Sequence, residues 1–152
     1  MNWDAIQAFA ETLSAIAVLI TLIYLASQIR QNTRALKGTT LNAITVQTGE
    51  ELRWASEQME LMLKARESIE NLSDVEKGRL STWLSSALHA RENEFFQYKL
   101  GLLDEDVWQS RLKIIAAMFE SESTVILWKT NAHVFSGEFC ILVEEIISKR
   151  DA

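Results

Sequence analysis

The hydrophobic pattern of the chain begins with a long apolar run. Eighteen consecutive residues from Thr12 to Ile29 carry no charge, and extension back to Ile6 gives about 24 residues, or ~36 Å of helix. This length is sufficient to span a lipid bilayer. Because the first basic residue is Arg30, the chain lacks the basic start of a cleaved signal peptide, and residues 1–37 are predicted to be an uncleaved transmembrane anchor. The alternatives are a core helix of a soluble protein and a helix lying in the membrane plane.

Charges at the two ends of this run predict its orientation. Asp4 and Glu11 lie at its start, whereas Arg30, Arg34 and Lys37 follow its end. Because basic residues collect on the cytoplasmic side, we expect the N-terminus in the periplasm and the rest of the chain in the cytoplasm. The three basic residues are also suited to contact lipid headgroups.

One face of the predicted span is small and polar. Such a stripe favours close helix packing and hydrogen bonding within a membrane, and it predicts self-association. An alternative is that the stripe lines the pore of an oligomeric ion channel, with Glu11 attracting cations at the outer mouth. The stripe consists of Gln7, Ala10, Glu11, Ser14, Ala17, Thr21 and Gln28.

After the anchor, the pattern is compatible with helix but is interrupted at Gly38 and Gly49, so one long helix or two bent helices are possible. The predicted buried face of this segment comprises Leu52, Met59, Met62 and Leu63, with Trp54 beside it.

Helix boundaries are clearer in the second half of the chain. Ser73 and Glu76 form a capping-box pattern, which predicts a helix from about Asp74 to just before Gly101. Asp104 and Ser136 are predicted N-caps, and a short helix is expected around 125–132. The predicted apolar faces are Leu80, Trp83, Leu84, Ala87, Leu88 and Phe95; Val107, Trp108, Leu112, Ile115, Met118 and Phe119; Leu127 and Trp128; and Phe139, Cys140, Leu142, Val143, Ile146 and Ile147.

Composition agrees with an all-α fold, because the 152 residues include no proline and only five glycines. The sequence therefore predicts one transmembrane helix followed by a domain of about five helices in residues 38–152. A net charge of -6, without a dense basic run, argues against nucleic acid as a partner. The single cysteine, Cys140, is expected to be a small buried side chain.

A polar cluster at His89, Glu92, Asn93 and Gln97 is the strongest candidate for chemistry. Helical spacing places His89 one turn from Glu92, and such a pair could bind a metal or share a proton. The order differs from the E-x-x-H of di-iron bundles, and polar contact between packed helices is the simpler interpretation. Neither a phosphate-binding glycine loop nor a G-x-S-x-G motif is present, so no enzymatic activity and no cofactor are predicted.

Two blocks of sequence, LIYLASQIRQNTRA at 22–35 and ENEFFQYKLGLLDEDVW at 92–108, resemble a family of small bacterial inner-membrane proteins with one N-terminal span and a helical remainder. The resemblance implies a bacterial inner-membrane location. It implies no activity, because none is known for that family.

The interpretation that best combines these features is a homo-oligomeric inner-membrane protein whose helical domain serves as an assembly or interaction module. Its expected partners are membrane lipids, other copies of the chain and a possible unidentified protein. The rival hypotheses are the channel and a membrane-tethered enzyme or metal protein that uses His89 and Glu92.

Overall fold

The structure, a computed structural model, describes residues 2–150, apart from the side chain of Ala5. Six α-helices and two short 3-10 helices make up this part of the chain, which contains no strand. The chain divides into two compact units, Met1–Thr39 and Thr40–Ala152, and the first α-helix belongs to both. The all-α prediction is confirmed, with five α-helices following the long N-terminal one.

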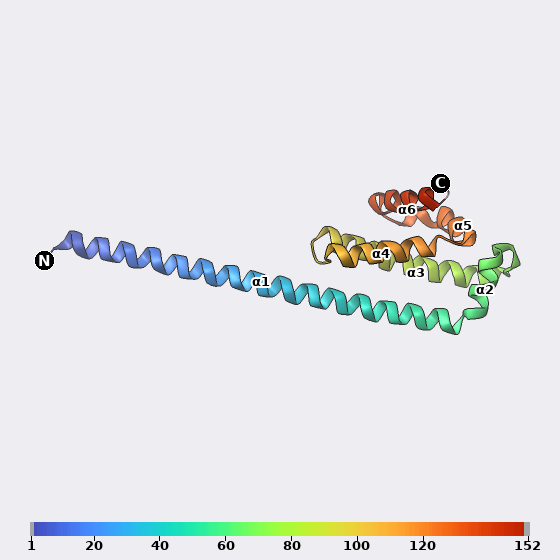
Figure 1. Ribbon diagram of the computed structural model, residues 1–152, viewed down its shortest axis with the longest axis horizontal. Helices are drawn as coiled ribbons and strands as arrows, with labels where there is room; N and C mark the ends of the chain where they lie inside the picture. The colour runs from blue at the N-terminus through green and yellow to red at the C-terminus, as the bar shows by residue number, and fades with distance from the viewer. Residues whose placement is uncertain (1, 151–152) are drawn as a thin grey trace. The chain divides into compact units, whose positions relative to one another are not determined.

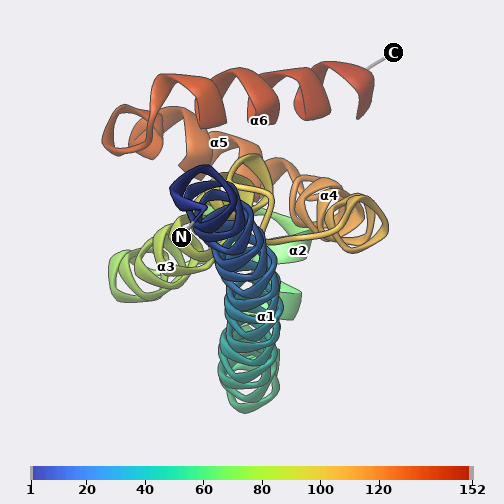
Figure 2. The same ribbon diagram turned by 90° about the vertical axis from the view of Figure 1, so that its left-hand side faces the viewer.

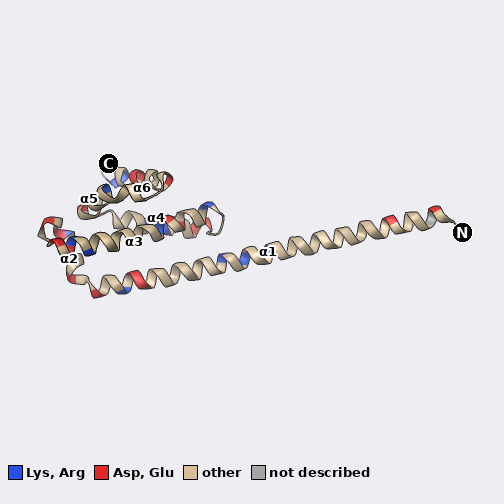
Figure 3. Ribbon diagram, turned by 180° about the vertical axis from the view of Figure 1, so that it is seen from behind, with Lys and Arg blue, Asp and Glu red and all other residues tan. Residues whose placement is uncertain are grey.

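Helix α1 (Trp3–Glu57) runs through both predicted interruptions. A glycine within a helix costs only about 1 kcal/mol relative to alanine, which the neighbouring helix-forming residues offset at Gly38 and Gly49. Of the two alternatives, one long helix is therefore observed, and its break comes at Gln58, whose backbone leaves the helical region (φ -108, ψ 28). Figure 3 shows the charge-free run of α1 as an unbroken tan stretch before the first basic residues.

By length and composition, α1 is able to cross a membrane, and it is the one helix among the described residues with this property. The chain buries no part of its apolar window.

In helix α2 (Met59–Glu67) the buried face differs from the one predicted for residues 52–63. Leu61 and Ala65 are the buried residues of this helix, whereas Leu52, Met59 and Leu63 are exposed and Met62 and Trp54 are partly buried. The prediction assumed one continuous helical register across residues 52–63. The break at Gln58 changes that register and turns a different face of α2 inward.

Helix α3 (Asp74–Lys99) begins and ends as the sequence predicts. Ser73 and Glu76 form the complete capping box. Gly101 adopts φ 74, a conformation that glycine tolerates best, and the N–H groups of Gly101 and Leu102 donate to the carbonyls of Tyr98 and Gln97. This Schellman arrangement reverses the chain into helix α4 (Glu105–Met118), with Asp104 at its N-cap position.

Helix α5 (Glu122–Asn131) begins about three residues earlier than predicted and is followed by helix α6 (Gly137–Arg150). The hydroxyl of Ser136 accepts a hydrogen bond from the N–H of Phe139 at 3.4 Å, which agrees with its predicted capping role. Two short 3-10 helices connect the α-helices: Ile69–Asn71 lies between α2 and α3, and Ala132–Val134 lies between α5 and α6. Cys140 is only partly buried, and its thiol lies 3.4 Å from the carbonyl oxygen of Ala132.

Within the second unit, α3 and α4 lie side by side, with α5 and α6 on one side of them and residues 40–57 of α1 on the other (Figures 1 and 2). The predicted apolar faces of α3 to α6 meet in one core, where Leu88, Ile115, Phe119, Trp128 and Phe139 are almost wholly inaccessible to solvent.

Candidate functional site

The small and polar stripe of α1 is open to the surroundings. Gln28 is partly covered and the other six side chains are exposed. The Ser14 and Thr21 hydroxyls donate to the carbonyls of Ala10 and Ala17 at 2.8 and 2.9 Å, and the Gln7 amide donates to Glu11. The first two bonds satisfy the hydroxyl donors within the helix itself, so Ser14 and Thr21 are compatible with an apolar environment.

The predicted headgroup contacts lie one turn apart on α1. Arg30 and Arg34 are exposed and Lys37 is partly covered. Two exposed guanidinium groups therefore lie just after the apolar run, where lipid headgroups would contact them.

The His89 cluster proves to be part of the packing between α3 and α6. Nδ1 of His89 lies 3.3 Å from Glu92, and the other carboxylate oxygen of Glu92 accepts a hydrogen bond from the Ser136 N–H at 2.7 Å. Burial disfavours the charged carboxylate, but the Ser136 hydrogen bonds and His89 outweigh this effect and lower the pKa of Glu92. Glu92 is thus an ionised contact at the start of α6.

The other two residues of the cluster, Asn93 and Gln97, lie apart from this contact. The Gln97 amide approaches Asn93 at 3.5 Å, and the exposed ring of His89 packs against Phe135 at 4.4 Å between centroids. Within residues 2–150, no three His, Cys, Asp or Glu residues lie close enough together to hold a metal ion. The geometry gives the His89–Glu92 pair a structural role.

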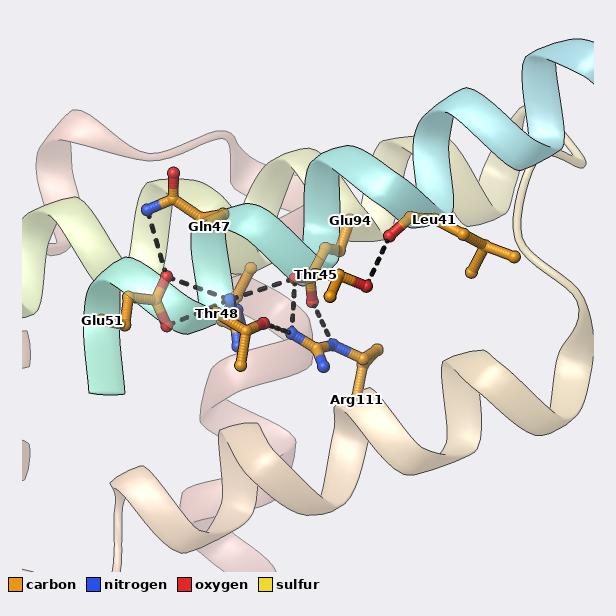
Figure 4. A network of polar contacts seen from close by, with 8 residues as sticks. Leu41, Thr45, Gln47, Thr48, Glu51, Glu94 and Arg111 are labelled. Carbon is orange, nitrogen blue, oxygen red and sulfur yellow. Dashed lines mark hydrogen bonds and ion pairs between the residues drawn. The ribbon is translucent and has the colours of Figure 1, made fainter. Parts of the chain in front are cut away.

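A different group of polar residues forms the most deeply buried charged site of the described chain. Glu94 is 2% exposed and accepts two hydrogen bonds from Arg111, both at 2.8 Å, through Nε and Nη2 (Figure 4). Arg91, which is 1% exposed, lies one turn before Glu94 on α3, and its Nη2 lies 3.0 Å from the same carboxylate. Two guanidinium groups from neighbouring helices therefore share one buried carboxylate.

Residues 40–57 of α1 complete this ion network. Arg91 donates to both oxygens of Glu51, at 3.1 and 3.2 Å, and Arg111 donates to the Thr48 hydroxyl at 3.0 Å. Gln47 donates to Glu51 from one turn earlier (Figure 4). We use the name ion network below for Thr48, Glu51, Arg91, Glu94 and Arg111.

Electrostatic balance explains how these charges are buried together. Two carboxylates face two guanidinium groups, so the ion network has no net formal charge. Burial lowers the pKa of Arg91, whereas Glu94 and Glu51 act in the opposite direction. A neutral, hydrogen-bonded set of this kind constrains how helices meet.

Sequence reasoning missed the ion network, although a signal for it exists. Arg91 and Glu94 follow Leu84 and Leu88 at helical spacing and so fall on the apolar face of α3, while Arg111 falls beside Trp108 and Leu112 on that of α4. Charged residues at predicted core positions require buried partners of opposite sign. The identity of the fourth charged residue, Glu51, depends on tertiary structure.

Comparisons with known proteins give no relative from which a role can be transferred: no protein-family model, no curated protein sequence and no solved structure matches the chain.

Proposed function

We propose that the protein is a homo-oligomeric protein of a bacterial inner membrane, anchored by α1, with its N-terminus in the periplasm and its helical domain in the cytoplasm. In this proposal the domain of residues 38–152 is an assembly or interaction module without enzymatic activity.

The apolar run of α1 is the observation that carries the proposal. Within Ile6–Glu57, an 18-residue window is apolar enough for a membrane span, and none of this window is buried by the rest of the chain. An exposed apolar surface of this length is unfavourable in water, and lipid relieves that cost. The basic residues that follow it support the proposed orientation.

The stripe on α1 supports self-association within the membrane. Its small side chains allow a second helix backbone to approach closely, and the hydroxyls of Ser14 and Thr21 already donate within the helix. We therefore favour packing between copies of α1 over a water-filled pore, because no observation other than the stripe itself supports a pore.

Cysteine cross-linking in membranes tests this packing directly. In a Cys140→Ser background, we expect Ser14→Cys and Thr21→Cys chains to form cross-linked dimers. Ile16→Cys and Ile23→Cys are matched controls, because each lies two residues further along the helix, on nearly the opposite face at a similar depth. Equal cross-linking on both faces, or none on either, would contradict the proposed interface.

A further inference from the structure

Residues 40–57 of α1, which we call the α1 arm, contribute no buried side chain to the core. The buried residues of the second unit begin at Leu61, and within the arm the most covered side chains are only partly buried. Trp54 is the arm's one contribution to the packed apolar cluster. The core of α2 to α6 is therefore built almost entirely from residues outside the arm.

The contact between the arm and α3 is also incompletely packed. Trp54 stacks on Trp83 with ring centroids 5.2 Å apart. Two hollows of about 770 and 230 Å³ lie between the arm and α3, and this Trp pair lines both of them. Both hollows are open to solvent, so the arm and α3 make fewer dispersion contacts along this boundary than the helices make in the core.

Besides the Trp54–Trp83 stack, polar contacts hold the arm. Glu51 binds Arg91 and Thr48 binds Arg111, whereas the bond between Arg111 and Glu94 lies wholly within α3 and α4. If the arm left, Arg111 would keep its carboxylate, Arg91 would keep Glu94, and the freed charges would gain hydration. Water can therefore replace the polar bonds of the arm, unlike the apolar contacts of a core.

We propose that the Glu51–Arg91 and Thr48–Arg111 contacts form a latch, and that the α1 arm detaches from α3 and α4 as a unit while the core of α2 to α6 stays folded. The helix break at Gln58 provides the hinge. The latch is a conformational device built from charge, independent of whether copies associate in the membrane.

Hydrogen–deuterium exchange of the full chain in detergent micelles tests this latch. Glu51→Gln removes the charge at nearly constant shape, and we expect about tenfold faster exchange within the arm, since a charged hydrogen bond contributes on this order. Once undocked, the arm is the unsupported C-terminal end of α1, which frays in solvent, so its amides exchange more readily. The amides of α3 to α6 are expected to keep their protection.

Glu50→Gln is the matched control, because Glu50 lies on the same turn but pairs with exposed Arg53 on its own helix. This variant should leave exchange in the arm unchanged. Unchanged exchange in the arm of Glu51→Gln would overturn the latch, and so would an equal loss of protection in the arm and in α3 to α6.

Discussion

Glu76 illustrates how a single side chain can stabilise a helix start. Its carboxylate accepts hydrogen bonds from the Ser73 N–H and hydroxyl, both at 2.8 Å, and from Lys64 at 3.3 Å. The Ser73 backbone bond is the largest cause of a pKa lowered from 4.5 to about 2. All three bonds favour the ionised carboxylate, so they are strongest above the ordinary pKa of a glutamate.

This pKa predicts a defined pH dependence. Because the folded pKa is lower than the unfolded one, the stabilising contribution of Glu76 is complete above about pH 4.5 and is lost as the pH falls towards 2. We expect a Glu76→Gln variant to melt at a lower temperature than the wild type at pH 7, with the difference closing in acid. Thermal unfolding across this pH range measures it, and a difference that stayed constant with pH would contradict the prediction.

Other residue-level features divide into local ones, which the sequence predicts, and long-range ones, which it does not. The Ser73–Glu76 box and the turn at Gly101 depend on residues within one or two helical turns and are correctly predicted. The Glu51–Arg91 bond joins residues 40 positions apart. No periodicity identifies such a partner, so the ion network emerges only from the fold.

At the level of elements, α3 to α6 follow their apolar periodicity, and most of their predicted inward positions are buried or partly buried. The segment 52–63 does not, because its helix breaks at Gln58, where neither glycine nor proline marks a boundary. At Gly38 and Gly49 the sequence left one long helix and two bent helices open, and the single helix is observed. A glycine lowers helix stability without ending a helix.

Replacement by alanine is expected to have opposite effects on stability at a glycine within a helix and at a glycine with positive φ. A Cβ at Gly49, within α1, meets no atom within 4 Å, so Gly49→Ala should raise stability by about 0.5–1 kcal/mol. Gly101 also has open space but adopts φ 74, so Gly101→Ala should lower stability by about 1 kcal/mol.

Denaturant unfolding of the full chain in detergent, followed by circular dichroism, measures both changes. A destabilising Gly49→Ala would show instead that another copy of the chain approaches this face closely.

For the whole molecule, one chain combines two units with different physical requirements. Met1–Thr39 contains an apolar helix that the rest of the chain does not bury, whereas Thr40–Ala152 contains its own core and a balanced ion network. The sequence predicts this division through its charge-free run.

The mass of the intact protein in lipid nanodiscs, determined by native mass spectrometry, tests the proposed membrane-embedded assembly most directly. The chain has a mass of 17.3 kDa. We predict that the protein enters nanodiscs and is released from them as one species whose mass is a whole-number multiple of that value, at least twofold. A single chain in the nanodisc, or a protein that remains in the aqueous fraction without lipid, would contradict the account.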